Sequence, residues 1–120
     1  MELDQEISVT VPLGTRASIH CTYGTGCYSR DYIHWYQKKE GESFKRILYI
    51  DMDNGAETKD PDYKDNKNFQ AEKKGNEFIL KFPEVKSSHR AVYYCACWIQ
   101  THTVRITVNR LHKNYSSRMC

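Results

Sequence analysis

The sequence predicts an all-β fold, an antiparallel Greek-key sandwich of two sheets. Short runs alternate apolar and polar residues, as strands with one buried face do. Turn residues separate these runs at intervals of about 8–12 residues, and no segment keeps a long helical period. The third observation is the order Cys21, Trp35 and Tyr93-Tyr94-Cys95 in a chain of 120 residues, a length that suits one domain with one core.

The first third of the chain contains three expected strands. Residues 7–11 and 17–21 alternate apolar with polar side chains, and the turn Pro12-Leu13-Gly14 lies between them. A loop containing Gly24-Thr25-Gly26 then leads to residues 33–37. Because side chains alternate across a strand, this third strand places its isoleucine and its tryptophan on the inner face.

The same pattern continues through the rest of the chain. Residues 46–50 form a strand, and Asp53-Asn54-Gly55 closes it as a hairpin, since Asn-Gly readily adopts the positive φ angles of such turns. Residues 57–68 are charged and irregular. We expect two hairpin strands, a short helical turn and one further strand after them, at residues 69–73, 78–82, 83–88 and 91–95.

The spacing of cysteine, tryptophan and tyrosine resembles that of an immunoglobulin variable-type sandwich. In that fold a disulfide joins the two sheets, an indole packs on it, and a tyrosine two residues before the second cysteine bonds back to the backbone. The resemblance implies a disulfide between Cys21 and Cys95 and core positions for Trp35 and Tyr93. The Tyr93 hydroxyl is expected to reach the backbone of residues 84–87. Such a fold presents loops to a partner and seldom carries out chemistry.

Composition and charge exclude several classes of function. A net charge of +3 is too small to indicate nucleic-acid binding, and no apolar run approaches the roughly 20 residues of a membrane span. The first residues lack the features of a signal peptide, so we expect a mature fragment whose leader and C-terminal membrane anchor are encoded elsewhere. Five cysteines favour an oxidising compartment, and Cys95-Ala96-Cys97 with scattered histidines lacks zinc-site spacing. We therefore expect no metal, no cofactor and no enzyme activity.

Three segments resemble a T-cell receptor gamma variable segment: Tyr32-Ile33-His34-Trp35-Tyr36, Glu40-Gly41, and residues 91–98, which end in Cys-Ala-Cys-Trp. The resemblance implies pairing with a delta-type variable domain and recognition of a protein or small-molecule antigen by loops. It also implies a place on the extracellular side of the plasma membrane, as part of a longer chain. A non-recombining adhesion or inhibitory receptor domain and an antibody light-chain variable domain remain alternatives.

Two departures from this family stand out. Where the family has an aspartate paired with a basic residue, this chain has His89 and Asn68, which we expect to hydrogen-bond to each other. The joining motif Phe-Gly-x-Gly is also absent after Cys95. We nevertheless expect residues 103–108 to pair as a last strand, because valine and isoleucine alternate there with polar residues. The domain is then residues 1–108, and residues 109–120 are a loose tail.

The tail suggests a genetic origin. Read back into codons, His102-Thr103-Val104 fits a recombination heptamer, and residues 112–115 fit the matching nonamer at close to the spacing found beside T-cell receptor variable genes. We hypothesise that the chain is a germline segment translated through its recombination signal.

The candidate site residues fall into three sets. In this fold the first and third loops are neighbours, so Cys27 and Cys97 are candidates for a second disulfide, which requires Cα atoms within about 7 Å; two unrelated thiols are the alternative. The resemblance implies ligand contacts from the loops, at Tyr28, Arg30, Tyr32, Asp51, Asp53, Asn54, Trp98, Ile99 and Gln100. It implies a partner-domain interface at Tyr36, Lys38, Phe44, Arg46 and Tyr49.

Overall fold

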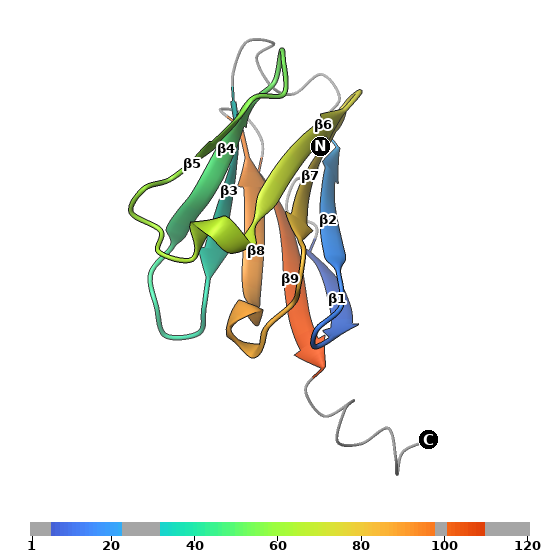
Figure 1. The fold of residues 1–120 in the computed structure, drawn as a ribbon, viewed down its shortest axis with the longest axis vertical. Helices are drawn as coiled ribbons and strands as arrows, with labels where there is room; N and C mark the ends of the chain where they lie inside the picture. The colour runs from blue at the N-terminus through green and yellow to red at the C-terminus, as the bar shows by residue number, and fades with distance from the viewer. Residues whose placement is uncertain (1–5, 23–31, 98–100, 110–120) are drawn as a thin grey trace.

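Two β-sheets pack face to face in the computed structural model, which describes residues 6–22, 32–97 and 101–109 (Figure 1). The strands are β1 (Glu6–Pro12), β2 (Ala17–Thr22), β3 (Tyr32–Lys38), β4 (Lys45–Asp51), β5 (Glu57–Lys59), β6 (Gln70–Lys74), β7 (Glu77–Phe82), β8 (Ala91–Ala96) and β9 (Thr101–Asn109). Two short 3₁₀ turns, η1 (Asn66–Asn68) and η2 (Ser87–His89), are the helical segments of the described residues. The expected all-β sandwich is confirmed.

The larger sheet has the order β1-β9-β8-β3-β4-β5, and the smaller has the order β2-β7-β6. Neighbouring strands are antiparallel with one exception, because β1 runs parallel to β9 from Glu6 opposite Thr103 to Pro12 opposite Asn109. The expected antiparallel sandwich therefore contains one parallel pair at this edge. The chain leaves β1 and crosses to the other sheet at β2, so β1 pairs with the last strand instead of with its neighbour in sequence.

The core lies between the sheets, and its pattern follows the alternation seen in the sequence. In β3 the side chains of Ile33, Trp35 and Gln37 are buried, while those between them face outward. Strand β8 alternates in the same way around the buried Tyr93. The largest fully buried side chains are Trp35, Tyr93, Phe69, Phe82, Ile33, Ile47, Leu48, Ile50, Leu80 and His89.

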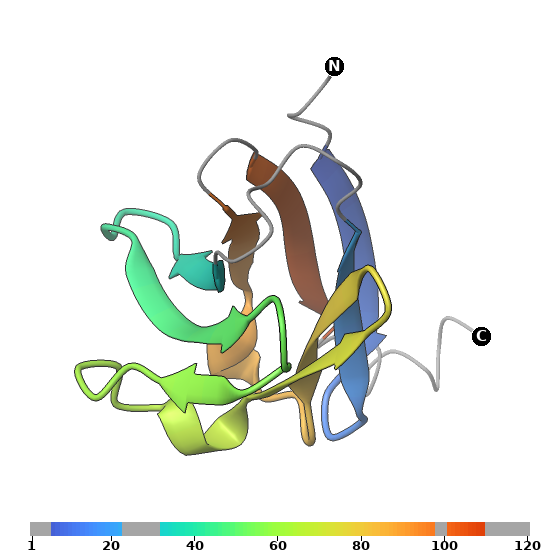
Figure 2. The same cartoon turned by 90° about the horizontal axis from the view of Figure 1, so that it is seen from above.

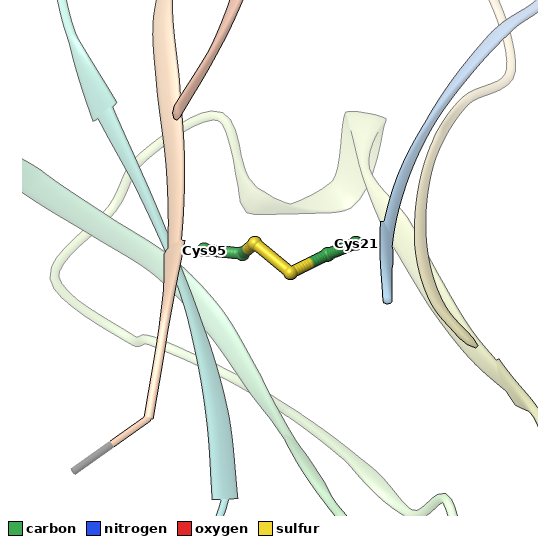
Figure 3. Close-up of a disulfide and its surroundings, with 2 residues drawn as sticks. All are labelled: Cys21 and Cys95. Atoms are coloured by element: carbon green, nitrogen blue, oxygen red, sulfur yellow. A yellow bond between two sulfur atoms is a disulfide. The ribbon is translucent and has the colours of Figure 1, made fainter. Parts of the chain in front are cut away.

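A disulfide between Cys21 of β2 and Cys95 of β8 crosses the core and joins the two sheets (Figure 3). The two Cα atoms lie 6.6 Å apart, and 74 residues separate the cysteines in sequence. Trp35 stands directly opposite Cys95 in the register of β3 with β8. The pairing of Cys21 with Cys95 that the family pattern implied is thus confirmed.

The turns form where glycine permits them. Gly55 has φ 75° between β4 and β5, and its N–H donates to the carbonyl of Asp51. Gly75 has φ 59° between β6 and β7. Both conformations are sterically unfavourable for residues with a side chain, so the two hairpins need glycine at these positions.

A polar cluster lies under η2, at the opposite end of β8 from Cys95. The Tyr93 hydroxyl donates to the carbonyl of His89 at 2.6 Å, just beyond the expected residues 84–87, and accepts a bond of 2.9 Å from Gln37 Nε2. The expected bond between Asn68 and His89 does not form. Asp65 lies between them and accepts from Asn68 Nδ2 with one carboxylate oxygen, while its other oxygen faces His89 Nε2. This carboxylate meets both polar groups, which explains why neither bonds to the other.

The strand directions bring several connections to one end of the sandwich, which Figure 2 views from above. Strands β2, β4 and β8 end there, and β3, β5 and β9 begin there. The segments 23–31, 52–56 and 97–100 therefore start and finish at the same end, which we call the loop end.

Candidate functional site

The outer face of the larger sheet carries one group of aromatic side chains on β3, β8 and the segment before β4. The Phe44 ring lies 5.0 Å from Tyr94 and 6.5 Å from Tyr36, in edge-to-face geometry. Phe44 is 53% exposed, an unusual position for a phenylalanine. Its hydrophobic surface is therefore available to a partner.

A second group continues from the first toward the loop end. The Tyr49 ring lies 5.3 Å from Tyr32 and 5.6 Å from His34. His34 also stacks with Tyr36 at 6.3 Å, so it joins the two groups. We call the combined surface the aromatic row, and its members are Tyr32, His34, Tyr36, Phe44, Tyr49 and Tyr94.

Two cations border the aromatic row. Lys38 Nζ lies 5.8 Å from the centre of the Phe44 ring and donates to the carbonyl of Glu42 at 2.7 Å. Arg46 lies over the face of Tyr49, with its Cζ 4.7 Å from the ring centre. Both positions are consistent with cation–π attraction, which fixes long side chains at the rim of an apolar surface.

Arg46 is anchored from below by Asp60. Its Nε donates to Asp60 Oδ2 at 3.0 Å, and the Asp60 carboxyl also accepts from the backbone N–H of Asp62 at 2.9 Å. The Asp62 bond is the larger cause, and Arg46 a smaller one, of a pKa for Asp60 below its ordinary value. The carboxylate therefore stays ionised and keeps Arg46 in place over Tyr49.

The structure brings together all five residues expected at the partner interface: Tyr36, Lys38, Phe44, Arg46 and Tyr49. Sequence reasoning missed His34, Tyr94 and Asp60. Alternation along β3 and β8 was a usable signal for the first two, because Tyr94 lies between two buried residues and pairs with Tyr36 in register. No pattern in the sequence indicated that Asp60 would accept a hydrogen bond from Arg46.

At the loop end, the second connection is held by its own side chains. Asp51 Oδ1 accepts from the backbone N–H groups of Asp53 at 2.7 Å and Asn54 at 3.2 Å. Asn54 Oδ1 accepts from the N–H of Ala56 at 2.8 Å. Two of the three predicted ligand residues in this turn, Asp51 and Asn54, hold the backbone through hydrogen bonds. Asp53 and Asn54 are exposed.

The remaining loop predictions are only partly covered by the structure. Tyr32, at the start of β3, is 41% exposed and packs against Tyr49. The other predicted residues of the first and third loops lie outside the described residues: Cys27, Tyr28, Arg30, Trp98, Ile99 and Gln100.

Cys97 directly follows β8 and is half-buried and disulfide-bonded. Its partner is neither of the core cysteines, because Cys21 and Cys95 are bonded to each other. The loop end therefore contains a covalent link in addition to the one in the core.

Within residues 6–22, 32–97 and 101–109, no group of three or more histidine, cysteine, aspartate or glutamate side chains is arranged to hold a metal ion. None of the described segments forms a helix with the length and apolar character that a bilayer crossing requires.

The expected final strand forms over Thr101–Asn109, without the glycine motif that usually begins it in this family. Its register with β8 is continuous from Ala96 opposite Thr101 to Ala91 opposite Ile106. Only residues 97–100 connect the two strands. The third loop of this chain is therefore short.

Comparison with known proteins identifies the family. The immunoglobulin V-set domain family matches residues 4–112. T cell receptor gamma variable 5 of Homo sapiens is 32% identical over 91 residues, which cover 76% of this chain and 75% of the relative. T cell receptor gamma variable 3 of Homo sapiens is 30% identical over the same shares, and the T-cell receptor gamma chain V region V108B of Mus musculus is 30% identical over 82% of this chain and 84% of its own. With its two sheets, its inter-sheet disulfide and these relatives, the chain belongs to the immunoglobulin V-set family and, within it, to the T cell receptor gamma variable segments.

Proposed function

We propose that this chain is a recognition domain that pairs with a delta-type variable domain through its aromatic row and presents its loop end to an antigen. The exposed Phe44, packed against Tyr36 and Tyr94, is the observation that carries the pairing. Aromatic side chains and arginine are enriched at protein interfaces because they bury a large area at a small cost in conformational entropy.

The chemistry of the row favours a second protein domain over a small ligand. Its residues lie on a sheet face and not in an enclosed cavity, and Lys38 and Arg46 border them with polar groups. An apolar centre with a polar rim is the usual anatomy of a protein–protein interface. The rigid strands β3, β4 and β8 hold the face in one geometry before the partner arrives.

The antigen role rests on the loop end. Sheet-to-sheet linkage through Cys21 and Cys95 fixes the strands from which the loops emerge, and Asp53 and Asn54 offer exposed polar groups there. We infer that the domain works by binding and not by catalysis. The disulfides and the family support a location on the extracellular side of the plasma membrane.

Pairing can be tested directly with purified domains. We expect Phe44→Asp to weaken association with a delta-type variable domain by roughly thirty-fold or more, the loss produced by removing an interface residue worth about 2 kcal/mol. Gln70→Glu, which makes the same change in charge on an exposed position of β6, should leave the affinity unchanged. Isothermal titration calorimetry measures both.

Equal affinities of the two variants would contradict the proposal that the aromatic row binds the delta-type domain. Tighter binding to an antibody heavy-chain domain than to the delta-type domain would instead favour the light-chain alternative.

One observation favours a second candidate function. Strand β9 completes the sheet from this chain's own residues, so the domain is structurally closed without a joining segment. A variable-type cell-surface receptor that never recombines would have this property. The nucleotide sequence across codons 101–116 separates the candidates, because a heptamer, a spacer and a nonamer mark a recombining segment, while their absence marks a receptor that functions as encoded.

A further inference from the structure

The dipeptide Asn54-Gly55 has a reactivity that its role as a hairpin turn does not use. When glycine follows asparagine, the glycine nitrogen can attack the side-chain amide of the asparagine, and no side chain on the glycine hinders the approach. Asparagine is accordingly counted among the thermolabile residues. Among the asparagines of the sequence, Asn54 alone precedes a glycine. It is exposed in the connection between β4 and β5, so water and hydroxide reach it.

The folded turn engages both reacting groups. The Gly55 N–H donates to the Asp51 carbonyl at 2.9 Å. Because the nitrogen attacks only after it loses this proton, the bond restrains the attack as it restrains hydrogen exchange. Asn54 Oδ1 accepts from the N–H of Ala56 at 2.8 Å, which directs the side-chain amide past Gly55. The Ala56 bond would also stabilise the oxyanion that attack creates, but only after Gly55 has left the Asp51 carbonyl, so the native turn slows the reaction.

Further contacts keep this turn closed. Asp51 Oδ1 accepts from the backbone N–H groups of Asp53 at 2.7 Å and Asn54 at 3.2 Å. Gly55 also packs against the smaller sheet, since a Cβ atom placed on it would lie 3.2 Å from the Cβ of Lys73 in β6. The Asp51 side chain is the part of this arrangement that a single substitution can remove.

We propose that Asn54-Gly55 is a deamidation site whose reaction is restrained by the folded turn and released when the turn opens. The Gly55 nitrogen loses its proton and bonds to Cγ of Asn54, and the amino group of the Asn54 side chain takes up a proton and leaves as ammonia. The product is a cyclic succinimide. Water then adds to either of its two carbonyl carbons and opens the ring, which gives aspartate or isoaspartate. Overall, water is consumed and ammonia is released, and no oxidant or reductant is needed.

The two products change the loop end in different ways. Aspartate adds a negative charge beside Asp51 and Asp53 and keeps an oxygen that can accept from Ala56. Isoaspartate inserts the side-chain methylene carbon into the backbone. This insertion disturbs the bond of 2.9 Å from the Asp51 N–H to the Ala56 carbonyl and the pairing of Ile50 with Glu57. Only the effect of these changes on antigen binding rests on the proposed function; the reaction itself does not.

Peptide mapping of the full chain tests the site. The folded wild type is incubated at body temperature and mildly alkaline pH, beside the same chain unfolded in guanidinium with its disulfides intact. Trypsin places Asn54, Asn66, Asn68 and Asn76 in separate peptides, so mass spectrometry assigns each gain in mass to one asparagine. Asn54 should react first in the unfolded chain, and at least several-fold faster there than in the folded protein. Its product should separate into two isomeric peptides, one with aspartate and one with isoaspartate.

Asn76 is the control within the chain. It is exposed in the hairpin between β6 and β7, but Glu77 follows it and hinders the attacking nitrogen. In the unfolded chain Asn76 should therefore react more slowly than Asn54. Faster reaction at another asparagine, or no product at Asn54 in the unfolded chain, would overturn the site. Equal rates at Asn54 in the folded and unfolded chains would overturn the restraint by the turn.

A matched pair of variants tests what restrains the reaction. Asp51→Ala removes the acceptor that holds the two backbone N–H groups and should speed deamidation of Asn54 several-fold in the folded protein. Asp51→Asn keeps an acceptor and should react at the wild-type rate, and fragment masses distinguish position 51 from Asn54 in their shared peptide. Both variants should match the wild type when unfolded.

Equal folded-state rates for Asp51→Ala and the wild type would overturn the role of the Asp51 side chain. The comparison of the folded with the unfolded wild type does not depend on either variant. None of these experiments uses the delta-type domain or an antigen, so failure of the pairing experiment and failure of this proposal are distinguishable.

Discussion

His89 is buried among aromatic side chains and pairs with the partly exposed Asp65, with His89 Nε2 3.2 Å from Asp65 Oδ2. The other ring nitrogen, Nδ1, accepts a bond of 2.9 Å from the backbone N–H of Lys86. A nitrogen that accepts cannot carry a proton, so this geometry requires the neutral ring with its proton on Nε2, donated to Asp65. Phe69 and Phe82 pack edge-on against the same ring.

Acid should destabilise the domain through His89. Burial is the main cause that lowers the pKa of His89, Asp65 opposes it, and Lys86 and Lys39 add to the lowering. Because the unfolded chain has a histidine pKa of about 6.5, it binds the proton more readily than the folded protein below that pH. The free energy of unfolding should therefore fall as the pH drops below about 6.5, until the folded-state pKa is reached.

Guanidinium denaturation at pH 7.5, 6.5 and 5.5 measures this dependence. The control is His89→Gln, which keeps a polar side chain that does not titrate and should show a weaker fall across the same interval. Identical pH profiles for the two proteins would show that His89 is not responsible.

Replacing Trp35 with alanine should cost about 3–5 kcal/mol of stability, because the cavity would lie at the centre of the core beside the disulfide. Its indole Nε1 has no hydrogen-bond partner among the described residues, so the side chain contributes by packing. Trp35→Phe should therefore cost clearly less than Trp35→Ala. Thermal unfolding followed by circular dichroism provides the comparison, and an unchanged midpoint for Trp35→Ala would contradict the packing role.

Removing the Tyr93 hydroxyl should cost roughly 1–3 kcal/mol. It donates to the His89 carbonyl and accepts from Gln37, so Tyr93→Phe leaves buried polar groups without this partner. Tyr94→Phe is the matched control on the outward face of the same strand and should change stability little. Chemical denaturation of both variants measures the difference, and similar losses would mean that burial of the hydroxyl is unimportant.

Asp51 should prove to be a structural residue of the turn. Asp51→Asn retains an oxygen that can accept from the two backbone N–H groups, whereas Asp51→Ala removes it at a cost of about 1 kcal/mol. Denaturation midpoints distinguish the variants. If Asp51→Asn lost as much stability as Asp51→Ala, the negative charge and not the acceptor would be the important feature.

Much of the fold could be predicted because it depends on short-range patterns. Alternation located the strands other than β5 (Glu57–Lys59), which lies in the segment expected to be irregular. Asn54-Gly55 located one hairpin, and the spacing of Cys21, Trp35 and Cys95 specified the sandwich. Partners that come from distant loops could not be predicted in this way. Asp65 and Asp60 lie in the irregular charged segment, where no periodicity indicates which carboxylate will meet His89 or Arg46.

The substitution of His89 and Asn68 for the usual ion pair shows why pairwise reasoning was insufficient. Both partners had changed, and a direct hydrogen bond was the simplest replacement. In the structure a third residue, Asp65, contacts both Asn68 and His89. The cluster therefore still contains a carboxylate, but from a different position in the sequence. The aromatic row was predicted more fully, because all of its members except Phe44 occupy the outward positions of regular strands.

The parallel pairing of β1 with β9 joins the first described residues to the last. During synthesis β1 remains without its partner until residues 101–109 have left the ribosome. Folding of the larger sheet is then a late event that depends on contacts distant in sequence, which form slowly. A chain that ended near residue 100 would leave β8 as an open edge able to pair with other chains. Any segment that replaces residues 101–109 must therefore form a strand that pairs with β8 on one side and with β1 on the other.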